Sequence, residues 1–278
     1  MSRGVCTTGA FRLHDGSYLL FKNKDFGRPS FEDKLFVSRD CFGVCGTSSW
    51  AEADSSGDEF SGFSIGANSH GLFCADSNVR EEPLEGRNYD ELTEIALTEG
   101  TDVESAIEAV QRAQERDSYW CANLVLADPS CVATIEIRGT DLHYSIASDR
   151  VTRTNHHVHF GAEATDHDRV TTENRLAWST ERLSAAAGLP DILELQQSHD
   201  GGASGICNHT AYQTVYSYIL IGSSDGTRLI VKQGHPCEEG TAADLLLPLG
   251  THWSPDAAAT FQNSFPSSQA SPIATEDP

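Results

Sequence analysis

Cys6 and Asp25 are the residues near the start of the chain whose types and spacing could support nucleophilic chemistry. They lie on either side of an Asp-Gly dipeptide at 15–16, and Asp-Gly between two strand-forming segments is a strong hairpin signal. We expect strands at 6–13 and 17–26. With a two-residue turn, Cys6 lies directly opposite Asp25, which brings their Cβ atoms within about 4.5–5.5 Å.

A carboxylate beside Cys6 suits an N-terminal cysteine better than a cysteine within the chain. The carboxylate raises the pKa of a neighbouring thiol, which weakens a lone cysteine nucleophile, but it would hold an ammonium group in place. If the chain were cut between Val5 and Cys6, the new α-amino group, with a reference pKa of about 8, could accept the proton of its own thiol. The alternative is a buried strand cysteine beside an Asp near a turn, and the hairpin alone does not separate the two.

Such a cut has a chemical route within the chain. The thiol of Cys6 attacks the carbonyl of Val5, the thioester hydrolyses, and the first five residues depart. Removal of the initiating methionine alone would not expose Cys6, because four more residues precede it. We therefore expect 1–5 to be a propeptide.

The rest of the chain shows separate blocks of strand and helix patterns. Residues 62–79 predict a second hairpin, and helical periodicity or helix signals occur further along. Separate blocks of this kind predict an α+β layered fold with antiparallel sheets. The expected helices are 88–97, 102–116, 171–187 and 191–198, and the further strands are CANLVLAD, CVATIEIR, LHYSIAS, QTVYSYILIG and TRLIVKQ.

Amino-acid composition predicts a long loop inside the domain and a tail after its C-terminal end. Residues 28–60 are rich in Gly, Ser and acid and predict a long loop. After 250 the chain is mostly Ala, Ser, Pro and acid, which cannot build a core, so 251–278 is expected to be a flexible acidic tail. One domain at 6–250 remains.

The net charge of −22 is dispersed along the chain, and only four of the 19 basic residues are lysines. Nucleic acid is an unexpected partner, because phosphate binding requires a basic surface. A dispersed, acidic and lysine-poor surface is typical of halophilic proteins, in which salt screens the self-repulsion, so stability should fall at low ionic strength. The alternative is a merely acidic protein from an ordinary environment.

Apolar runs, the N-terminal segment and the cysteines indicate in which cellular compartment the protein is expected. No apolar run approaches the roughly 18 residues of a membrane span, and five residues before Cys6 are too few for a secretory signal. Eight cysteines without a C-x-x-C pair indicate reduced, buried thiols. We expect a cytoplasmic protein that does not contact membranes, and a homo-oligomer is compatible with the sequence.

Four segments, in order, carry a likeness to a known family. C-T-T-G-x(5)-D-G-S-x-L-L-x-K-N-x-D, from Cys6 to Asp25, resembles the N-terminal-nucleophile (Ntn) hydrolases of the choloylglycine hydrolase and penicillin acyltransferase (C45 peptidase-like) group. The resemblance implies a four-layer αββα sandwich of two antiparallel sheets, in which autocatalytic cleavage exposes the nucleophile. The three later segments are GANSHGLFCADSN at 66–78, VTRTNHH at 151–157 and GICNHTAYQTVYSYI at 205–219.

The resemblance also implies roles for individual residues. Cys6 would be the nucleophile, its freed amine the base, and Asp25 the group that orients this amine. Asn155, in the T-N-H element, would donate its amide to the oxyanion of the tetrahedral intermediate. Asn78 would be a second donor, and one such donor can be worth about 3–4 kcal/mol in the transition state.

Lys22 departs from the family pattern. It stands where the bile-salt and penicillin enzymes commonly have Arg, and strict alternation from Asp25 turns it to the opposite face unless a β-bulge intervenes. At the site it would favour the thiolate, without the bidentate grip of an arginine on a carboxylate. For the second arginine of the bile-salt branch, Arg169 and Arg175 are only nearby guesses, so substrate class is not carried over.

Two rival sites involve histidine. His157 and His159 share one face of an expected strand and could bind zinc, but no matched second group of ligands stands out beyond the acids and histidine at 166–168. Cys207 and His209 could form a Cys-His dyad, but side chains two apart on a strand do not approach hydrogen-bond distance. We expect no metal, and without a glycine-rich nucleotide motif no cofactor.

The sequence as a whole predicts an Ntn cysteine hydrolase or acyltransferase. It would cleave a non-peptide or small-peptide C–N amide bond of a small-molecule substrate through an acyl-enzyme on Cys6, and both outcomes share the first half-reaction. A catalytically inactive protein of the same fold that binds a ligand is the main alternative. A zinc-dependent hydrolase using the histidine cluster is a third.

Overall fold

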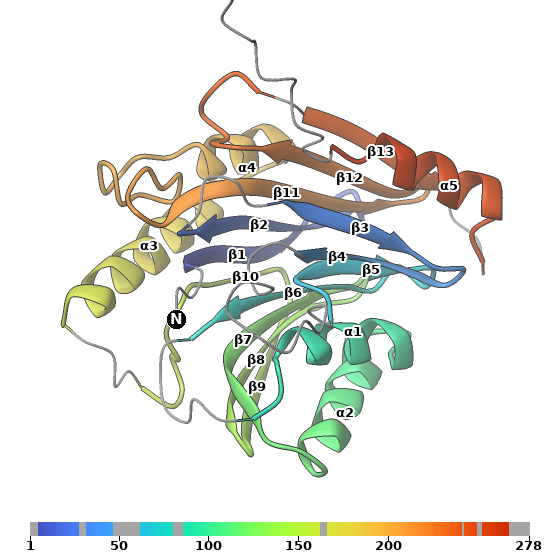
Figure 1. Ribbon diagram of the computed structural model, residues 1–278, viewed down its shortest axis with the longest axis horizontal. Coiled ribbons are helices and arrows are strands. Elements are labelled where there is room, and N and C mark those ends of the chain that lie inside the picture. Colours follow the sequence, from blue (N-terminus) through green and yellow to red (C-terminus); the bar gives the residue numbers. More distant parts are fainter. Residues whose placement is uncertain are drawn as a thin grey trace, which may run out of the picture.

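Two antiparallel sheets lie face to face at the centre of the protein, and helices cover the outer face of each (Figure 1). This arrangement, seen in a computed structural model, confirms the α+β sandwich expected from the sequence. The structure describes residues 5–27, 32–46, 62–79, 86–161, 166–240, 242–248 and 252–266.

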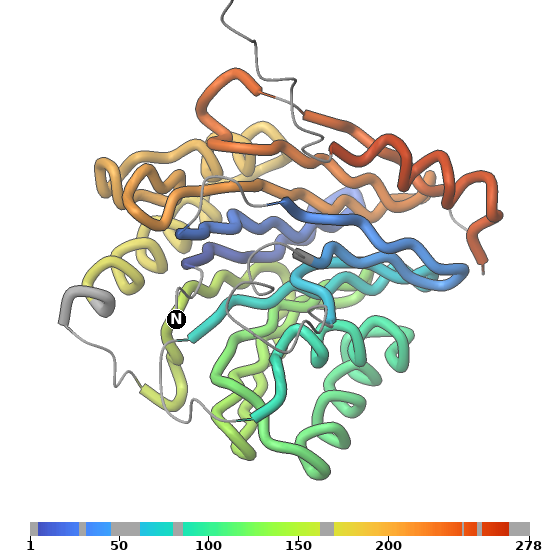
Figure 2. Tube along the Cα trace, in the orientation of Figure 1, coloured from blue at the N-terminus to red at the C-terminus, as the bar shows by residue number. Residues whose placement is uncertain are grey.

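The first sheet has six strands in the order β10-β1-β2-β11-β12-β13. The trace in Figure 2 shows β1 and β2, in blue, between β10 and β11, which come from the second half of the chain. Strands β1 and β2 therefore lie inside the sheet, not at its edge. The bounds are β1 (Val5–Arg12), β2 (Tyr18–Phe26), β10 (Arg150–Arg153), β11 (Gln213–Ser223), β12 (Gly226–Gln233) and β13 (Ala242–Pro248).

The second sheet has seven strands in sequence order, from β3 to β9. Each strand pairs with the next one along the chain, which gives a simple antiparallel meander. Its strands are β3 (Asp33–Val37), β4 (Cys41–Gly46), β5 (Ile65–Asn68), β6 (Phe73–Asn78), β7 (Tyr119–Ala127), β8 (Val132–Gly139) and β9 (Asp141–Ala147). The long loop expected at 28–60 is thus wrong for 33–46, which form two strands; 47–61 lie outside the described residues.

Three apolar layers hold these parts together. One lies between the sheets, a second lies between the second sheet and helices α1 and α2, and a third lies between the first sheet and helices α3 and α4. Alternation along β2 separates two of them, because Leu20 faces the layer between the sheets and Leu19 faces α3 and α4. The helices are α1 (Asp90–Glu99), α2 (Val103–Gln114), α3 (Asp166–Ala185), α4 (Leu189–Gln196) and α5 (Pro255–Ser264).

The turn between β1 and β2 differs from the expected one. The Leu13 backbone N–H donates to the Ser17 carbonyl (2.8 Å), and Gly16 has φ of +87°, so three residues form the loop, with glycine in the left-handed position. This extra residue shifts the register by one. Cys6 pairs with Lys24, and the predicted pairing of Cys6 with Asp25 is wrong.

The segment that follows 250 is partly ordered, contrary to the predicted tail. Helix α5 occupies part of it, and Trp253, Phe261 and Phe265 are buried in the layer between the sheets. The Phe261 ring lies 4.9 Å from that of Phe42, centroid to centroid. A few aromatic side chains on an alanine-rich helix are enough to anchor it, so the prediction is wrong for 252–266. Residues 267–278 lie outside the described residues.

None of the helices in the described ranges has the length and apolar character needed to cross a bilayer.

The packing of α5 can be tested with Phe261→Ala. Removing a buried aromatic ring typically costs about 3–5 kcal/mol, so we expect the free energy of unfolding to fall by that amount in urea denaturation. Leu246→Ala, on the exposed face of β13, is the matched control and should change stability by less than about 0.5 kcal/mol. Equal effects of the two substitutions would contradict the packed helix.

Candidate active site

The five residues predicted for the site, Cys6, Lys22, Asp25, Asn78 and Asn155, all lie around the start of β1. Cys6 is 5% exposed at the second position of that strand. Lys22 and Asp25 come from the neighbouring strand β2, Asn78 ends β6 in the other sheet, and Asn155 follows β10. Pairing of β1 with both β2 and β10 therefore brings together segments that are far apart in the sequence.

Asn155 holds the backbone of Cys6. Its Oδ1 accepts hydrogen bonds from the Cys6 N–H (2.8 Å) and from Nη2 of Arg175 (3.0 Å). Because both partners are donors only, the amide orientation is fixed. Nδ2 then donates to the carbonyl of Asn78 (2.7 Å), and its second N–H is the one that could meet an oxyanion.

Arg175, on α3, is the largest addition to the predicted site. It is 1% exposed, and its Nη1 donates to the carbonyl oxygen of Cys6 (2.7 Å) and to Oγ1 of Thr7 (3.1 Å). Sequence reasoning names it only as a guess beside Arg169, whose side chain lies outside the described part. One signal could have found it: Thr172, Arg175 and Ser179 recur at helical spacing on the buried face of α3.

Asp25 lies on the opposite face of β2 from the Cys6 side chain, toward α3 and α4. Thr214 Oγ1 donates to its Oδ1 (2.7 Å) and Asn208 Nδ2 to its Oδ2 (3.2 Å). Burial raises the pKa of Asp25 to about 7, against the charge of Arg175 and these two hydrogen bonds, which lower it. The carboxyl group is therefore poised between its neutral and ionised forms near neutral pH.

Lys22 lies on the same face as Cys6, in the layer between the sheets. The corrected register places it there by simple alternation, so no β-bulge is needed. Its Nζ donates to Oδ1 of Asp76 (2.9 Å) and to the carbonyl of Ser64 (2.8 Å). Burial opposes the charged form, but Asp76 and Cys6 outweigh this effect and raise the pKa of Lys22.

Groups around Cys6 shift the pKa of its thiol in opposite directions. Burial raises its pKa, Lys22 lowers it, and the carboxylates of Asp25 and Asp76 raise it further. A hydrogen bond from the Asp25 backbone N–H to the sulfur favours the thiolate and lowers the pKa. Lys22 is thus the main group that offsets the cost of a buried thiolate.

Two further acids were not singled out from the sequence. Asp76 and Asp90 are both buried, and Asp76 Oδ2 receives no N–H or hydroxyl hydrogen bond from the described residues. Burial, and then Asp76, raise the pKa of Asp90 well above its usual range. A hydrogen bond between the two carboxyl groups contributes to this shift, and the charges of Lys22 and Lys24 oppose it.

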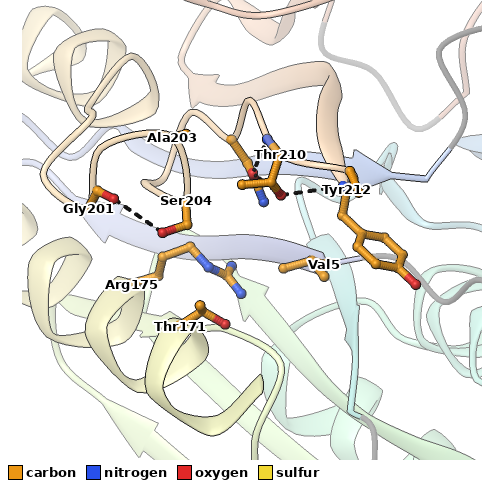
Figure 3. A pocket seen from close by; sticks show the side chains of 10 residues that line it. Val5, Thr171, Arg175, Gly201, Ala203, Ser204, Thr210 and Tyr212 are labelled. Carbon is orange, nitrogen blue, oxygen red and sulfur yellow. Dashed lines mark hydrogen bonds between the residues drawn. The ribbon is translucent and has the colours of Figure 1, made fainter. Parts of the chain in front are cut away.

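A cavity of about 530 Å³ opens beside Val5, on the α3 side of the first sheet (Figure 3). Arg175, Ser204 and Tyr212 line it together with Asn208, which holds Asp25. It therefore adjoins the residue on the amino side of Cys6, where the acyl part of a cleaved bond would lie.

The rival sites have different outcomes. The ring of His159 stacks on that of His143 at 3.4 Å, and His157 Nε2 lies 3.3 Å from the carbonyl of Ala122. Neither histidine belongs to a group of three or more metal-ligating side chains among those described; the side chains at 166–168, the other ligands considered, lie outside that part. By contrast, Cys207 Sγ lies 3.4 Å from His209 Nε2, so the expectation that they stay apart is wrong; they lie in a loop and not on a strand.

Comparisons with known proteins agree with this architecture. An N-acylethanolamine-hydrolyzing acid amidase (NAAA) ortholog from Caenorhabditis elegans matches with a TM-score of 0.53 and 11% identity, covering 93% of this chain and 98% of that chain. A variant of conjugated bile acid hydrolase from Clostridium perfringens matches with a TM-score of 0.49 and 13% identity, covering 87% and 92%. No curated protein sequence matches. The family of acyl-coenzyme A:6-aminopenicillanic acid acyl-transferases matches residues 12–190, more than half of the chain, and the chain belongs to this family.

Proposed function

We propose that this protein is a self-processing cysteine hydrolase or acyltransferase that acts on a small C–N amide. Cys6 is the nucleophile, and its own amino group, freed by cleavage after Val5, is the base. The observation that carries the proposal is the setting of the Val5–Cys6 bond. Asn155 and Arg175 hold the Cys6 side of this bond, and the cavity lies on the Val5 side.

Self-cleavage uses the groups around Cys6. The sulfur bonds to the Val5 carbonyl carbon, the bond from that carbon to the Cys6 nitrogen breaks, and the thiol proton passes to the nitrogen. Water then adds to the thioester, which releases the preceding segment with a new carboxylate and returns the thiol. Lys22 supports the sulfur as a thiolate. One N–H of the Asn155 amide donates to Asn78, and the other donates to the oxyanion.

The freed amine keeps its position because its neighbours are already arranged. In the uncleaved chain, the Cys6 nitrogen lies 2.8 Å from Asn155 Oδ1, which can accept equally well from an ammonium group. Asp25, electrostatically coupled to Cys6, adds a negative charge that stabilises this ammonium. The amine can then take the thiol proton when a substrate is attacked and donate it to the departing amine.

The substrate follows the same route as the propeptide. Its acyl group takes the place of Val5 in the cavity, and its amine departs. Ser204 and Tyr212 in the wall offer hydroxyl groups to polar atoms of the acyl group. Water completes hydrolysis, and an amine acceptor completes acyl transfer. A cytoplasmic location and a salt-dependent, halophilic stability belong to the same proposal.

Intact mass tests the central step. We expect the wild-type protein to lose the residues before Cys6 and the Cys6→Ala protein to keep them, because only the thiol can attack Val5. Cys131→Ala, which changes a half-buried cysteine far along the chain, should be processed like wild type. A panel of small amides at low and high salt should then be cleaved by the processed proteins alone. An uncut wild type that takes up no electrophile at Cys6 would instead indicate a catalytically inactive binding protein.

Lys22→Met tests the support of the thiolate. Lys22 lowers the pKa of Cys6, so its loss should move thiolate formation, and with it the rate of self-cleavage, to higher pH. The rate at neutral pH should fall about tenfold whenever the pKa of Cys6 rises by about one. Lys22→Arg should restore the profile, and Lys34→Met, on an exposed position of β3, should leave it unchanged.

The double variant Lys22→Met/Asp76→Asn removes both charges of the buried pair. This variant is needed if Lys22→Met fails to fold because the buried carboxylate of Asp76 has lost its positive partner. In the double variant we expect a smaller shift in the same direction, because Asp76 raises the pKa of Cys6 and its loss partly offsets the loss of Lys22. An unchanged pH profile in folded Lys22→Met would overturn the role of Lys22.

Asp25 should make stability depend on pH in the uncleaved Cys6→Ala protein. Its pKa is about 7 in the native state and about 3.9 when unfolded, so between these values the native state holds a proton that the unfolded state has lost. The contribution of Asp25 therefore falls as pH rises from about 4 to about 7. Denaturant titrations across this range should show the slope, and Asp25→Asn should make it shallower by the share of one proton, leaving the part that Asp90 contributes. A slope that the substitution leaves unchanged would assign it to other groups.

A further inference from the structure

Four metal-ligating side chains converge outside the proposed catalytic machinery. They are His199, Cys207 and His209, in the loop between α4 and β11, and Cys237, which follows β12. One ligand atom of each residue lies within 4.8 Å of all the others. Two thiols and two imidazoles form one of the usual donor sets of structural zinc.

The distances match the edges of a tetrahedron around zinc. Bond lengths of about 2.3 Å to sulfur and 2.0–2.1 Å to nitrogen give edges of about 3.3–3.8 Å. The His209 Nε2 atom lies 3.4 Å from Cys207 Sγ, 3.3 Å from Cys237 Sγ and 3.2 Å from His199 Nε2. The two sulfur atoms are 3.5 Å apart.

Hydrogen bonds alone do not account for these contacts. His209 Nε2 carries either one N–H or one lone pair, so it can serve one hydrogen bond well, yet it faces three polar atoms at 3.2–3.4 Å. A cation at the centre satisfies all four ligand atoms at once. We propose that these residues bind one Zn²⁺, which takes up two thiolates and two neutral imidazoles as the thiols release two protons.

The surroundings of His209 support the assignment. Its other ring nitrogen, Nδ1, faces Oε1 of Glu238 at 3.8 Å, and the His235 ring stacks on it with centroids 3.8 Å apart. Histidines that bind metal commonly direct their second nitrogen to a carboxylate, which fixes the ring and its tautomer. Glu238 occupies this place.

Zinc binding would stabilise the loop between α4 and β11, which contacts the proposed catalytic residues. Asn208, between two of the ligands, donates to Asp25, and Gly201, Ser204 and Thr210 of the same loop line the cavity. Four protein ligands leave zinc no open position for a substrate, so its role is structural. Only this link to Asp25 rests on the proposed function; zinc binding itself does not.

Metal content and cobalt spectroscopy test the site. The full-length Cys6→Ala protein, which does not depend on self-processing, is stripped with a chelator and titrated with Zn²⁺ or Co²⁺. We expect one equivalent of either metal per chain, visible bands of tetrahedral Co²⁺, and thiolate-to-cobalt charge transfer in the near ultraviolet. Cys207→Ser and Cys237→Ser should lose the charge transfer from one sulfur and weaken binding at least about tenfold.

Two variants act as controls. Cys131→Ser lies outside the cluster and should keep the stoichiometry and the spectrum. His199→Ala, at an exposed position, should fold normally but change the cobalt bands, which covers the case in which a cysteine variant does not fold. Absence of stoichiometric metal in the folded chain, when both cysteines have been kept reduced, would overturn the proposal. A wild type that self-cleaves normally but binds no zinc in the titration would reject the metal site and leave the proposed function intact.

Discussion

The register between β1 and β2 is the constraint on which the rest of the site depends. The three-residue turn with Gly16 in the left-handed conformation pairs Cys6 with Lys24 and Val5 with Asp25. Because the side-chain period of a strand is two, a shift of one residue would exchange the faces of Lys22 and Asp25. As observed, the cation shares the layer of the sulfur between the sheets, and the carboxylate lies on the side of the cavity.

This separation explains how so many charges are buried together. Lys22 is balanced by Asp76 in one layer, and Asp25 lies near Arg175 in another. Removing one partner of a buried pair typically costs about 3–5 kcal/mol, so each group depends on its counterpart. The thiol of Cys6 lies in the layer of Lys22 and Asp76, and its pKa responds to these two groups and to Asp25.

The sequence predicted which residues come together better than it predicted the local geometry. Ordered motifs singled out Cys6, Asp25 and Asn155, which the structure brings close together. The Asp-Gly turn, by contrast, is compatible with loops of two or three residues, and only tertiary packing selects between them. Arg175 and Asp90 lie on helices, where a single buried charge leaves little trace in the hydrophobic pattern. Their positions depend on how α1 and α3 pack on the sheets, which no local rule supplies.

The same limit applies to long-range and loop structure. Helix α5 is held by aromatic contacts with residues far away in the sequence, such as the one between Phe261 and Phe42. The expectation that Cys207 and His209 stay apart assumed a strand, but the loop turns back on itself and brings both to His199 and Cys237. The composition of such a segment shows how few apolar residues it has, but it does not show which distant residues these will pack against.

Strand β1 is a suitable place for a nucleophile that is created by cutting the chain. Termini are usually the most mobile part of a domain, and a catalytic group must be held closely. Here β2 pairs along one side of β1 and β10 along the other. Among the described residues, cleavage before Cys6 would remove only the pairing of Val5 with Asp25. The new terminus would therefore begin inside a sheet, with its first carbonyl held by Arg175. The order that the uncut chain establishes is what the freed amine would need in order to act as a base.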